Sequence, residues 1–277
     1  MRDLWAQCGI DWVQNERIFD AVFEPITAAI VSAADLQPGQ RVLDIGCGSG
    51  TLLAEVVAAG ATAAGVDISP AMVEAAARRV PEAAVVVGDA QTDDLAAALP
   101  GAPFDRIVSR FGVMFFADPV EAFANIGRAS MPGVRLAFAC WRTRAENPMF
   151  TLGSSVLESR LAPVPAPPVD APGPMAFADP DRVTSVLSEA GWTSIQIEPV
   201  DAECNCAIDT ADGVEERLTM ILSTTTGRAA REQLESTIGP AGWADLLGEV
   251  RAELRRHLVD GTVRFPVATW LVTASRS

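Results

Sequence analysis

The sequence lacks several residue types on which whole classes of chemistry depend. It contains no tyrosine and a single histidine, His257, so a phenolic base is excluded and imidazoles cannot cluster around a metal. His257 lies near the end of an expected helix, where the helix dipole favours a cation, and we expect a structural part for it. No nucleophile–base pair indicates covalent catalysis. We therefore expect no metal site, and the sequence identifies no catalytic residue.

Cysteine is also scarce, and the number is odd. The five cysteines are Cys8, Cys47, Cys140, Cys204 and Cys206. They do not form a disulfide framework, which points to a reducing cytoplasm. The N-terminus has acidic residues and no apolar signal core, and no stretch of 18 apolar residues occurs, so neither secretion nor a membrane span is expected.

Positively charged residues are few. The chain has 21 Lys and Arg against 36 Asp and Glu, a net charge of −15 and a pI near 4.4. This balance disfavours a long nucleic-acid interface and binding to anionic membranes, so a small-molecule substrate fits best. The length of 277 residues and 49% hydrophobic content allow a substantial core in one large domain or two small ones.

One stretch, residues 41–50, organises what is present: R-V-L-D-I-G-C-G-S-G. A short apolar strand, Val42 to Ile45, runs into a glycine-rich turn, and apolar residues at helical spacing follow from Leu52. Glycine is needed where the backbone turns sharply and a ligand comes close. A strand that feeds a helix through such a turn is the first unit of a nucleotide-binding α/β sheet.

The glycine pattern of this turn has two interpretations, a site for a dinucleotide or a site for S-adenosylmethionine. The dinucleotide fingerprint G-x-G-x-x-G needs a third glycine where Thr51 stands, because the glycine comes one residue early, at Gly50. Asp44, two residues before the first glycine, would repel a pyrophosphate but suits a cationic ligand. S-adenosylmethionine has no phosphate and carries an ammonium and a sulfonium. The stretch V-L-D-I-G-C-G-S-G closely resembles motif I of the class I S-adenosylmethionine-dependent methyltransferases.

Strands and helices alternate along most of the chain. We expect strands at 42–45, 61–68, 84–87, 104–109, 134–141, 192–200 and 263–274, with helices between them and a turn at 131–133. The strands are nearly all apolar, which is typical of a parallel sheet buried on both faces. The fold class is thus α/β, a Rossmann-like doubly wound sheet. The resemblance implies seven strands, the last antiparallel beside the fifth, and Pro266 within it suggests an edge position or a bulge.

The first three strands all end in aspartate: Asp44, Asp67 and Asp89. Ligands of such sheets bind outside the carboxyl ends of the strands. Asp67 follows the turn by about twenty residues, the place of the ribose-binding acid in nucleotide folds, so we assign it to the ribose. The resemblance implies that Asp44 faces the ammonium of the methionine moiety and that Asp89 binds the adenine amino group.

The resemblance supplies further roles near these aspartates. Ile68 would pack on the adenine and the Ala90 backbone would meet a ring nitrogen, while the glycine turn would give its backbone to the methionine moiety. After the fourth strand, S-R-F-G-V-M-F-F resembles a segment that closes over the methyl-donor side, with backbone contacts from its first two residues. Phe111 and Met114 in it either line the ligand or simply pack. The expected cofactor-binding residues are Asp44, Gly46, Cys47, Gly48, Asp67, Ile68, Asp89, Ala90, Ser109 and Arg110.

We expect a single domain with a cap. Residues 36–142, 181–200 and 263–277 would form the core, 1–35 a helical flap or simply a packed helix, and 143–180 and 201–262 cap insertions. The first insertion reads as a long loop, because it contains Pro163, Pro165, Pro167, Pro168, Pro172 and Pro174. The second reads as mostly helical. Both follow strands beside the family's usual acceptor site, so we expect them to determine substrate specificity.

The sequence thus predicts transfer of a methyl group from S-adenosylmethionine to a small-molecule acceptor. Proximity and orientation would carry most of the rate, because methyl transfer needs no dedicated base. Two alternatives stay open: a protein that binds the cofactor but has lost methyl transfer, and an NAD(P)-dependent oxidoreductase. The acceptor and the oligomeric state are not readable from the sequence.

Overall fold

The computed structural model describes residues 2–163, 168 and 171–277. Its centre is a sheet in the order β3-β2-β1-β4-β5-β8-β6, with a short β7 pairing only with β8. The strands are β1 Arg41–Ile45, β2 Thr62–Asp67, β3 Ala84–Val87, β4 Phe104–Arg110, β5 Ser130–Trp141, β6 Thr193–Asn205, β7 Leu258–Val259 and β8 Thr262–Arg276. The expected doubly wound sheet is confirmed, with β7 as an additional two-residue strand.

The order of the strands fixes where a ligand can bind. From β1 the chain builds outward through β2 and β3, then returns to the other side of β1 with β4 and β5, all parallel. The connections after β1 and β4 therefore leave in opposite directions, which opens a crevice at the carboxyl ends of these two strands. The glycine-rich turn after Ile45 lies at this switch point.

The last long strand is antiparallel, as expected, but it is not an edge strand. β8 lies between β5 and β6 and pairs antiparallel with both. Pairing with β5 ends at Thr269, whereas pairing with β6 continues through Pro266 to Arg264. Pro266 therefore lies where β8 pairs only with β6 and has no neighbour on its other side. Proline has no N–H to donate toward that open side, so no hydrogen bond of the sheet is lost.

The expected turn at 131–133 is instead a bulge inside β5. Phe104 pairs with Ser130 and Arg106 with Arg135, so the intervening part of β5 carries extra residues. Gly133 adopts a φ of 80°, which a glycine accommodates without strain. Pro132 and Gly133 thus distort the strand without ending it.

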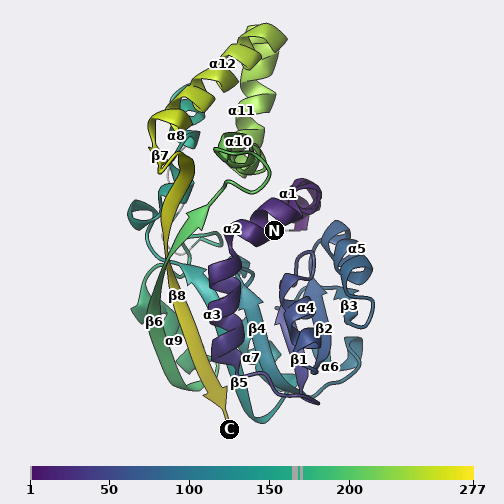
Figure 1. The fold of residues 1–277 in the computed structure, drawn as a ribbon. Coiled ribbons are helices and arrows are strands. Elements are labelled where there is room, and N and C mark those ends of the chain that lie inside the picture. Colours follow the sequence, from purple (N-terminus) through teal and green to yellow (C-terminus); the bar gives the residue numbers. More distant parts are fainter. Residues whose placement is uncertain (1, 164–167, 169–170) are drawn as a thin grey trace.

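Helices cover both faces of the sheet (Figure 1). On one face α3 (Glu24–Ala34), α4 (Thr51–Ala58) and α5 (Pro70–Arg79) pack side by side. On the other lie α6 (Leu95–Ala98), α7 (Pro119–Arg128) and α9 (Pro180–Glu189). Before α3, α1 (Arg2–Gln14) packs against α5, and α2 (Glu16–Val22) joins α1 to α3, so residues 2–34 are mostly helical, as expected.

The two insertions build a helical lobe at one end of the molecule (Figure 1). It contains η2 Arg144–Glu146, η3 Pro148–Phe150, α8 Ser154–Glu158, α10 Val214–Leu222, α11 Thr225–Ala230, η4 Arg231–Glu235 and α12 Ser236–Arg256. The first insertion is therefore not a loop throughout, because short helices precede its prolines. Pro165 and Pro167 lie outside the described residues, and the other four prolines have neither helix nor strand structure. Within the described ranges, no helix has the length and apolar content to cross a bilayer.

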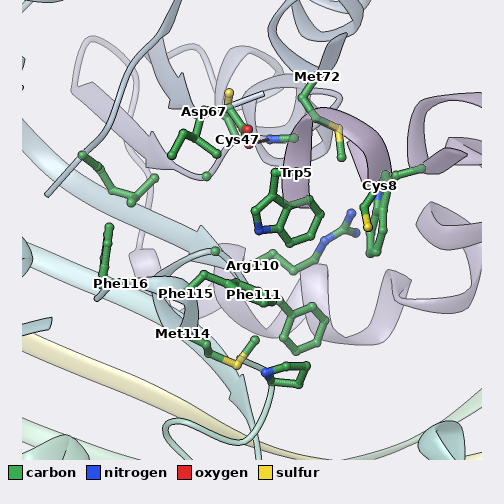
Figure 2. Close-up of a pocket in the computed structure, with 18 of the residues that line it drawn as sticks. Trp5, Cys8, Cys47, Asp67, Met72, Arg110, Phe111, Met114, Phe115 and Phe116 are labelled. Carbon is green, nitrogen blue, oxygen red and sulfur yellow. Dashed lines mark hydrogen bonds between the residues drawn. The ribbon is translucent and has the colours of Figure 1, made fainter. Parts of the chain in front are cut away.

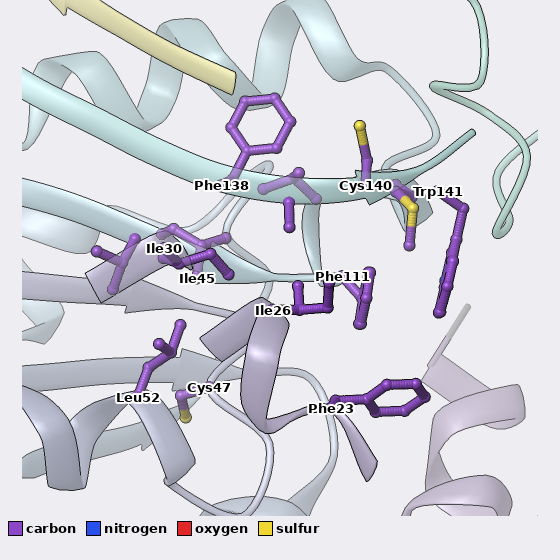
Figure 3. Close-up of a cluster of buried hydrophobic side chains, with 14 of the residues drawn as sticks. Phe23, Ile26, Ile30, Ile45, Cys47, Leu52, Phe111, Phe138, Cys140 and Trp141 are labelled. Carbon is purple, nitrogen blue, oxygen red and sulfur yellow. The ribbon is translucent and has the colours of Figure 1, made fainter. Parts of the chain in front are cut away.

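A continuous apolar core joins α3 to the sheet (Figure 3). Phe23, Ile26 and Ile30 are fully buried on this face, and Phe23 packs edge to face on Phe111 and Trp141 at the ends of β4 and β5. Phe138 of β5 points to the opposite face, where it meets Phe123 of α7. Burial of each side chain of this size contributes about 1.5–3 kcal/mol relative to its exposure. This packing holds the N-terminal helices firmly beside the carboxyl ends of the central strands.

Candidate functional site: a cavity at the switch point

The glycine turn is held by close backbone contacts from two sides. Gly46 has a φ of +67°, and a Cβ on it would lie 2.9 Å from the Cα of Gly112, in the segment after β4. Gly50 has a φ of +90°, and its Cβ would lie 3.2 Å from the Cα of Ala76 in α5. Side chains at these positions would push the turn away from its neighbours. The early third glycine, Gly50, thus serves the packing of α5.

A cavity of about 640 Å³ opens beside this turn, within the usual size range of ligand sites. Nine of the ten expected cofactor-binding residues line it, namely Asp44, Gly46, Cys47, Gly48, Asp67, Ile68, Asp89, Ala90 and Arg110. Figure 2 shows side chains from the turn, from the end of β4 and from α1 converging on it. The residues that the sequence placed at the ends of successive strands therefore lie around a single cavity.

Asp44 is a buried residue of the cavity lining, and one of its carboxyl oxygens lacks a hydrogen-bond partner. Only 2% of the residue is exposed, and its Oδ1 makes no hydrogen bond. Burial raises the pKa of Asp44 to about 8, against the opposing effect of the Arg110 charge, and the Asp67 charge adds to the rise. A buried carboxyl with a free oxygen is costly unless a ligand completes it. A cationic group is the natural complement.

Unlike Asp44, Asp67 accepts hydrogen bonds from the protein at both of its carboxylate oxygens. One carboxylate oxygen accepts from the Gly48 N–H at 2.9 Å and the other from the Ser69 N–H at 2.9 Å. Burial raises the pKa of Asp67, while these backbone bonds lower it. Asp67 therefore ties the glycine turn to the start of α5 and still has lone pairs available to a ligand in the cavity.

The third strand-end aspartate belongs to an ordered loop. Asp89 accepts from the Gln91 N–H at 3.0 Å, and its own N–H donates to Asp93 at 2.8 Å. The Ala90 carbonyl accepts from the Asn125 side chain at 2.9 Å. These bonds fix the loop after β3, so Asp89 and Ala90 present a defined edge to the cavity.

Ser109 is the one expected residue that does not line the cavity. Its side chain is fully buried, its hydroxyl donates to the Ile45 carbonyl at 2.7 Å, and it accepts from the Gly112 N–H at 3.3 Å. Successive residues of a strand point to opposite faces, so Ser109 and Arg110 cannot both present side chains to the same space. The structure gives Ser109 a structural position, joining the ends of β1 and β4.

Arg110 lies at the cavity through its side chain, which the sequence did not predict. Its guanidinium donates to Thr27 at 2.8 Å, Asp20 at 3.1 Å and Thr51 at 3.2 Å. Asp20 also pairs with Arg79. No sequence signal reveals this cluster, because its members come from α2, α3, α4, α5 and β4.

The other end of the cavity is aromatic. Phe111 and Trp141 stack with ring centroids 4.3 Å apart and planes 4° apart, and Phe150 meets Trp141 edge to face at 5.3 Å. Phe23 packs on both stacked rings. Phe111, named from the sequence as a possible lining residue, indeed lines the cavity, as does Met114. This end offers flat apolar surfaces to a ligand.

Both insertions and the N-terminal helix reach the cavity. Trp5, Cys8 and Trp12 come from α1, Met149, Phe150, Pro172, Gly173 and Pro174 from the first insertion, and Ser223, Thr224 and Thr225 from the second. The Gly173 N–H donates to the Met114 carbonyl at 3.0 Å, which fastens the proline-rich segment to η1 (Val113–Phe115), the short helix after β4. The cavity is therefore walled by core and cap together.

Across the described ranges, no three His, Cys, Asp or Glu side chains are grouped so as to hold a metal ion. His257 follows α12 and is about half exposed, with Nδ1 2.9 Å from the Glu253 carbonyl. It does not line the cavity. The free thiols of Cys140, Cys204 and Cys206 are buried, and burial raises their pKa values.

Comparison with known proteins identifies the family. Residues 43–138 match the model of a methyltransferase domain. The chain is 30% identical to a demethylmenaquinone methyltransferase of Beutenbergia cavernae over 177 residues, which cover 60% of this chain and 71% of that enzyme. The chain belongs to the class I S-adenosylmethionine-dependent methyltransferases. The aklanonic acid methyltransferase DauC of a Streptomyces is 31% identical over 50% of this chain and 62% of that enzyme.

Solved structures agree on the fold of this methyltransferase. The YcgJ protein of Bacillus subtilis superposes with a TM-score of 0.56 at 14% identity, covering 90% of this chain and 97% of that one. Family membership makes S-adenosylmethionine the cofactor and small-molecule methylation the reaction, and it decides against an NAD(P)-dependent oxidoreductase. The cavity fits this cofactor, because the buried, unpartnered Asp44 oxygen is complementary to an ammonium.

Proposed function

We propose that this methyltransferase methylates a small, flat, largely apolar acceptor that lies against the aromatic end of the cavity. One observation carries the proposal: the same cavity joins the strand-end carboxylates to the stacked pair Phe111 and Trp141. A ring that stacks on such a pair gains about 0.5–1.5 kcal/mol beyond the burial of its area. The two relatives are named for demethylmenaquinone and aklanonic acid, and ring compounds of these kinds are suitable first probes.

We assign the cofactor's parts to the carboxylates in the order of the strands. Asp44 faces the ammonium, Asp67 accepts from the ribose hydroxyls, and Asp89 accepts from the adenine amino group. The remaining contacts are backbone and packing contacts from Gly46, Cys47, Gly48, Ile68 and Ala90. The free oxygen of Asp44, the residual lone pairs of Asp67 and the fixed loop at Asp89 support these assignments.

When bound, the cofactor supplies a methyl carbon already activated by its sulfonium. The chain then needs to align the acceptor with that carbon and keep water out, and near-attack alignment alone can supply about 7–11 kcal/mol. Phe150 and Trp141 orient the acceptor ring, while Trp5 and Trp12 of α1 cover the cavity. Water, or a cap carboxylate that we do not identify, takes any acceptor proton. We therefore propose α1 as a flap and both insertions as specificity elements.

The net charge and the free cysteines support a proposal for the partners and the compartment of the protein. The net charge of −15 opposes a nucleic-acid partner. All five cysteines are free in the structure, four of them buried, which supports a reducing compartment such as the cytoplasm.

The test is transfer of a labelled methyl group from S-adenosylmethionine to a panel of acceptors: quinols, polycyclic phenols, linear aliphatic alcohols and amines. We expect turnover with ring acceptors only. Phe150→Ala removes one aromatic wall and should raise KM for the ring acceptor about tenfold, while S-adenosylhomocysteine affinity is unchanged. Ile238→Ala, an exposed change in α12, is the matched control. Turnover of aliphatic acceptors in preference to rings would refute the proposed acceptor class.

A further inference from the structure

A second hollow in the surface shares none of its described lining residues with the cofactor cavity. It has a volume of about 360 Å³, and these residues all belong to the neighbouring strands β4, β5, β8 and β6. It lies near the start of β4 and the end of β8, at the end of the sheet away from the helical lobe (Figure 1). We call it the arginine groove, and its lining includes Arg106, Gly133, Arg135, Ser194, Thr273 and Ser275.

Two arginines lie side by side in this groove. Arg106 and Arg135 are directly opposite each other on β4 and β5, so their side chains share a face of the sheet. Arg106 is held in place, because its Nε donates to the Ala34 carbonyl at 2.9 Å and its Nη1 to the Asp105 carbonyl at 3.0 Å. Its Nη2 hydrogens and one Nη1 hydrogen remain for a ligand. Arg135 is exposed and forms no hydrogen bond or ion pair with a described residue.

The carboxylates near the groove do not neutralise these two charges. Asp105, next to Arg106 in the chain, binds Arg41 through both carboxylate oxygens, at 3.1 and 3.2 Å. Asp35 and Glu198 do not line the groove, and its described lining contains no acidic side chain. Like charges placed directly opposite each other on adjacent strands are destabilising. A ligand that carries negative charge would remove this repulsion.

The strands on either side supply polar groups to the same groove. Gly133 lies in the bulge of β5 and Ser194 in a bulge of β6, with φ angles of 80° and 51°. A left-handed backbone is strained for a serine, and bulge residues are left out of the hydrogen-bond ladder. The hydroxyls of Thr273 and Ser275 make only contacts of 3.5 Å, so they are free to turn toward a ligand.

We propose that the arginine groove binds the phosphate group of a small phosphorylated molecule. Two guanidiniums offer forked donors that match the oxygens of a phosphate, and a dianion balances both charges. A carboxylate has one charge and two oxygens, so it satisfies the pair less well. Arg106 precedes Arg110 by four residues, about 13 Å along β4, so the groove is distinct from the methyl-transfer site and does not depend on the proposed acceptor.

Amide resonances of the isotope-labelled protein test this site, with inorganic phosphate as the probe at constant ionic strength. We expect the Gly133 and Ser194 resonances to shift and to saturate, with half-saturation at about 1 mM, the affinity of a few charge-assisted bonds. Acetate should need a concentration about tenfold higher for the same shifts. The resonances of Gly46 and Gly48 report any binding in the cofactor cavity.

Arg135→Gln removes an exposed guanidinium that holds no other described residue, so the fold should persist and half-saturation should rise by about tenfold or more. Arg78→Gln is the matched control and should bind phosphate as the wild type does, because Arg78 is also exposed, pairs with Glu74 on α5 and does not line the groove. Shifts at Gly133 and Ser194 that do not saturate, or that are unchanged in Arg135→Gln, would overturn the proposal. Acetate binding as tight as that of phosphate would overturn the assignment to a phosphate group.

Discussion

Binding of the cofactor should release a proton from Asp44. Asp44 has a pKa of about 8 in the free protein because it is buried, so at pH 7 about nine-tenths of the molecules hold it neutral. An ammonium beside the carboxylate favours its charged form. At pH 6–7, where the ligand ammonium is itself protonated, we expect close to one proton released per S-adenosylhomocysteine bound. Near pH 8 the release from Asp44 should fall to about half.

The assay is calorimetry in two buffers of different ionisation enthalpy. The chain has a single histidine, the residue type whose ordinary pKa lies in this range, which limits competing titrations. Asp44→Asn isolates the contribution of this carboxyl, because the amide cannot ionise, and the difference between the two proteins should be about one proton at pH 6. If the wild type released no more protons than Asp44→Asn, the carboxyl would not be the group that meets the ammonium.

The same shift fixes the sign of a stability effect. The folded pKa of Asp44 lies above its ordinary value, so its contribution to stability is fully present below about pH 4 and is lost as the pH rises through 8. Over that interval the loss approaches about 1.4 kcal/mol per pH unit. Without ligand, the Asp44→Asn variant should therefore melt at a higher temperature than the wild type at pH 8. Its affinity for S-adenosylhomocysteine should be lower than that of the wild type. Equal melting temperatures would show that Asp44 ionises without penalty.

Three further predictions concern other parts of the chain, and a fourth concerns metals. Asp67→Ala should weaken S-adenosylhomocysteine and methylthioadenosine alike by about 10- to 100-fold in calorimetry, and unchanged affinities would remove the ribose assignment. His257→Ala should keep turnover within about tenfold, whereas loss of a general base costs about 10²–10⁴. Arg217→Met should speed amide hydrogen exchange in the Met149–Leu152 segment while leaving S-adenosylhomocysteine affinity unchanged. Methyl transfer should persist in EDTA, and recovery by added magnesium would reveal a missed site.

The strand-end carboxylates could be predicted because their chemistry is local in sequence. Asp67 is the last residue of β2, and Asp44 and Asp89 lie within two residues of the ends of β1 and β3. Parallel strands bring their carboxyl ends to one edge. The bonds from the Gly48 and Ser69 N–H groups to Asp67 are consequences of that arrangement. The strands and helices of the sheet follow from the same local patterns, whereas the antiparallel last strand and several of the nine expected residues that line the cavity were implied by the resemblance to the methyltransferase family.

What could not be predicted depends on contacts between distant segments. The Asp20–Arg110 pair joins residues 90 positions apart, and neither lies in a pattern that indicates a partner. Ser109 was expected to contact the cofactor through its backbone because it ends a strand, but it does not line the cavity, and its hydroxyl donates to the Ile45 carbonyl. Pro132 was expected in a turn, but it lies in a bulge of β5, where the loss of a ladder donor is tolerated.

The second insertion shows how a contact between distant segments can shape the aromatic end of the cavity. Arg217 of α10 is fully buried, and its Nη2 donates to the carbonyls of Met149 at 2.6 Å and Leu152 at 2.8 Å. Its guanidinium also lies over the Phe265 ring of β8, 5.1 Å from the centroid. Burial lowers the pKa of Arg217 to about 10, so it is still charged at neutral pH.

Burial of a charge against two carbonyls and a ring face costs desolvation free energy, and a leucine of similar volume would avoid that cost. What the arginine adds is a fixed position for both ends of the segment that carries Met149 and Phe150. The second insertion therefore fixes the part of the cavity wall that the first insertion supplies. Loosening the contact should change the shape of the acceptor end and leave the cofactor end intact, which is why Arg217→Met separates the two parts of the cavity.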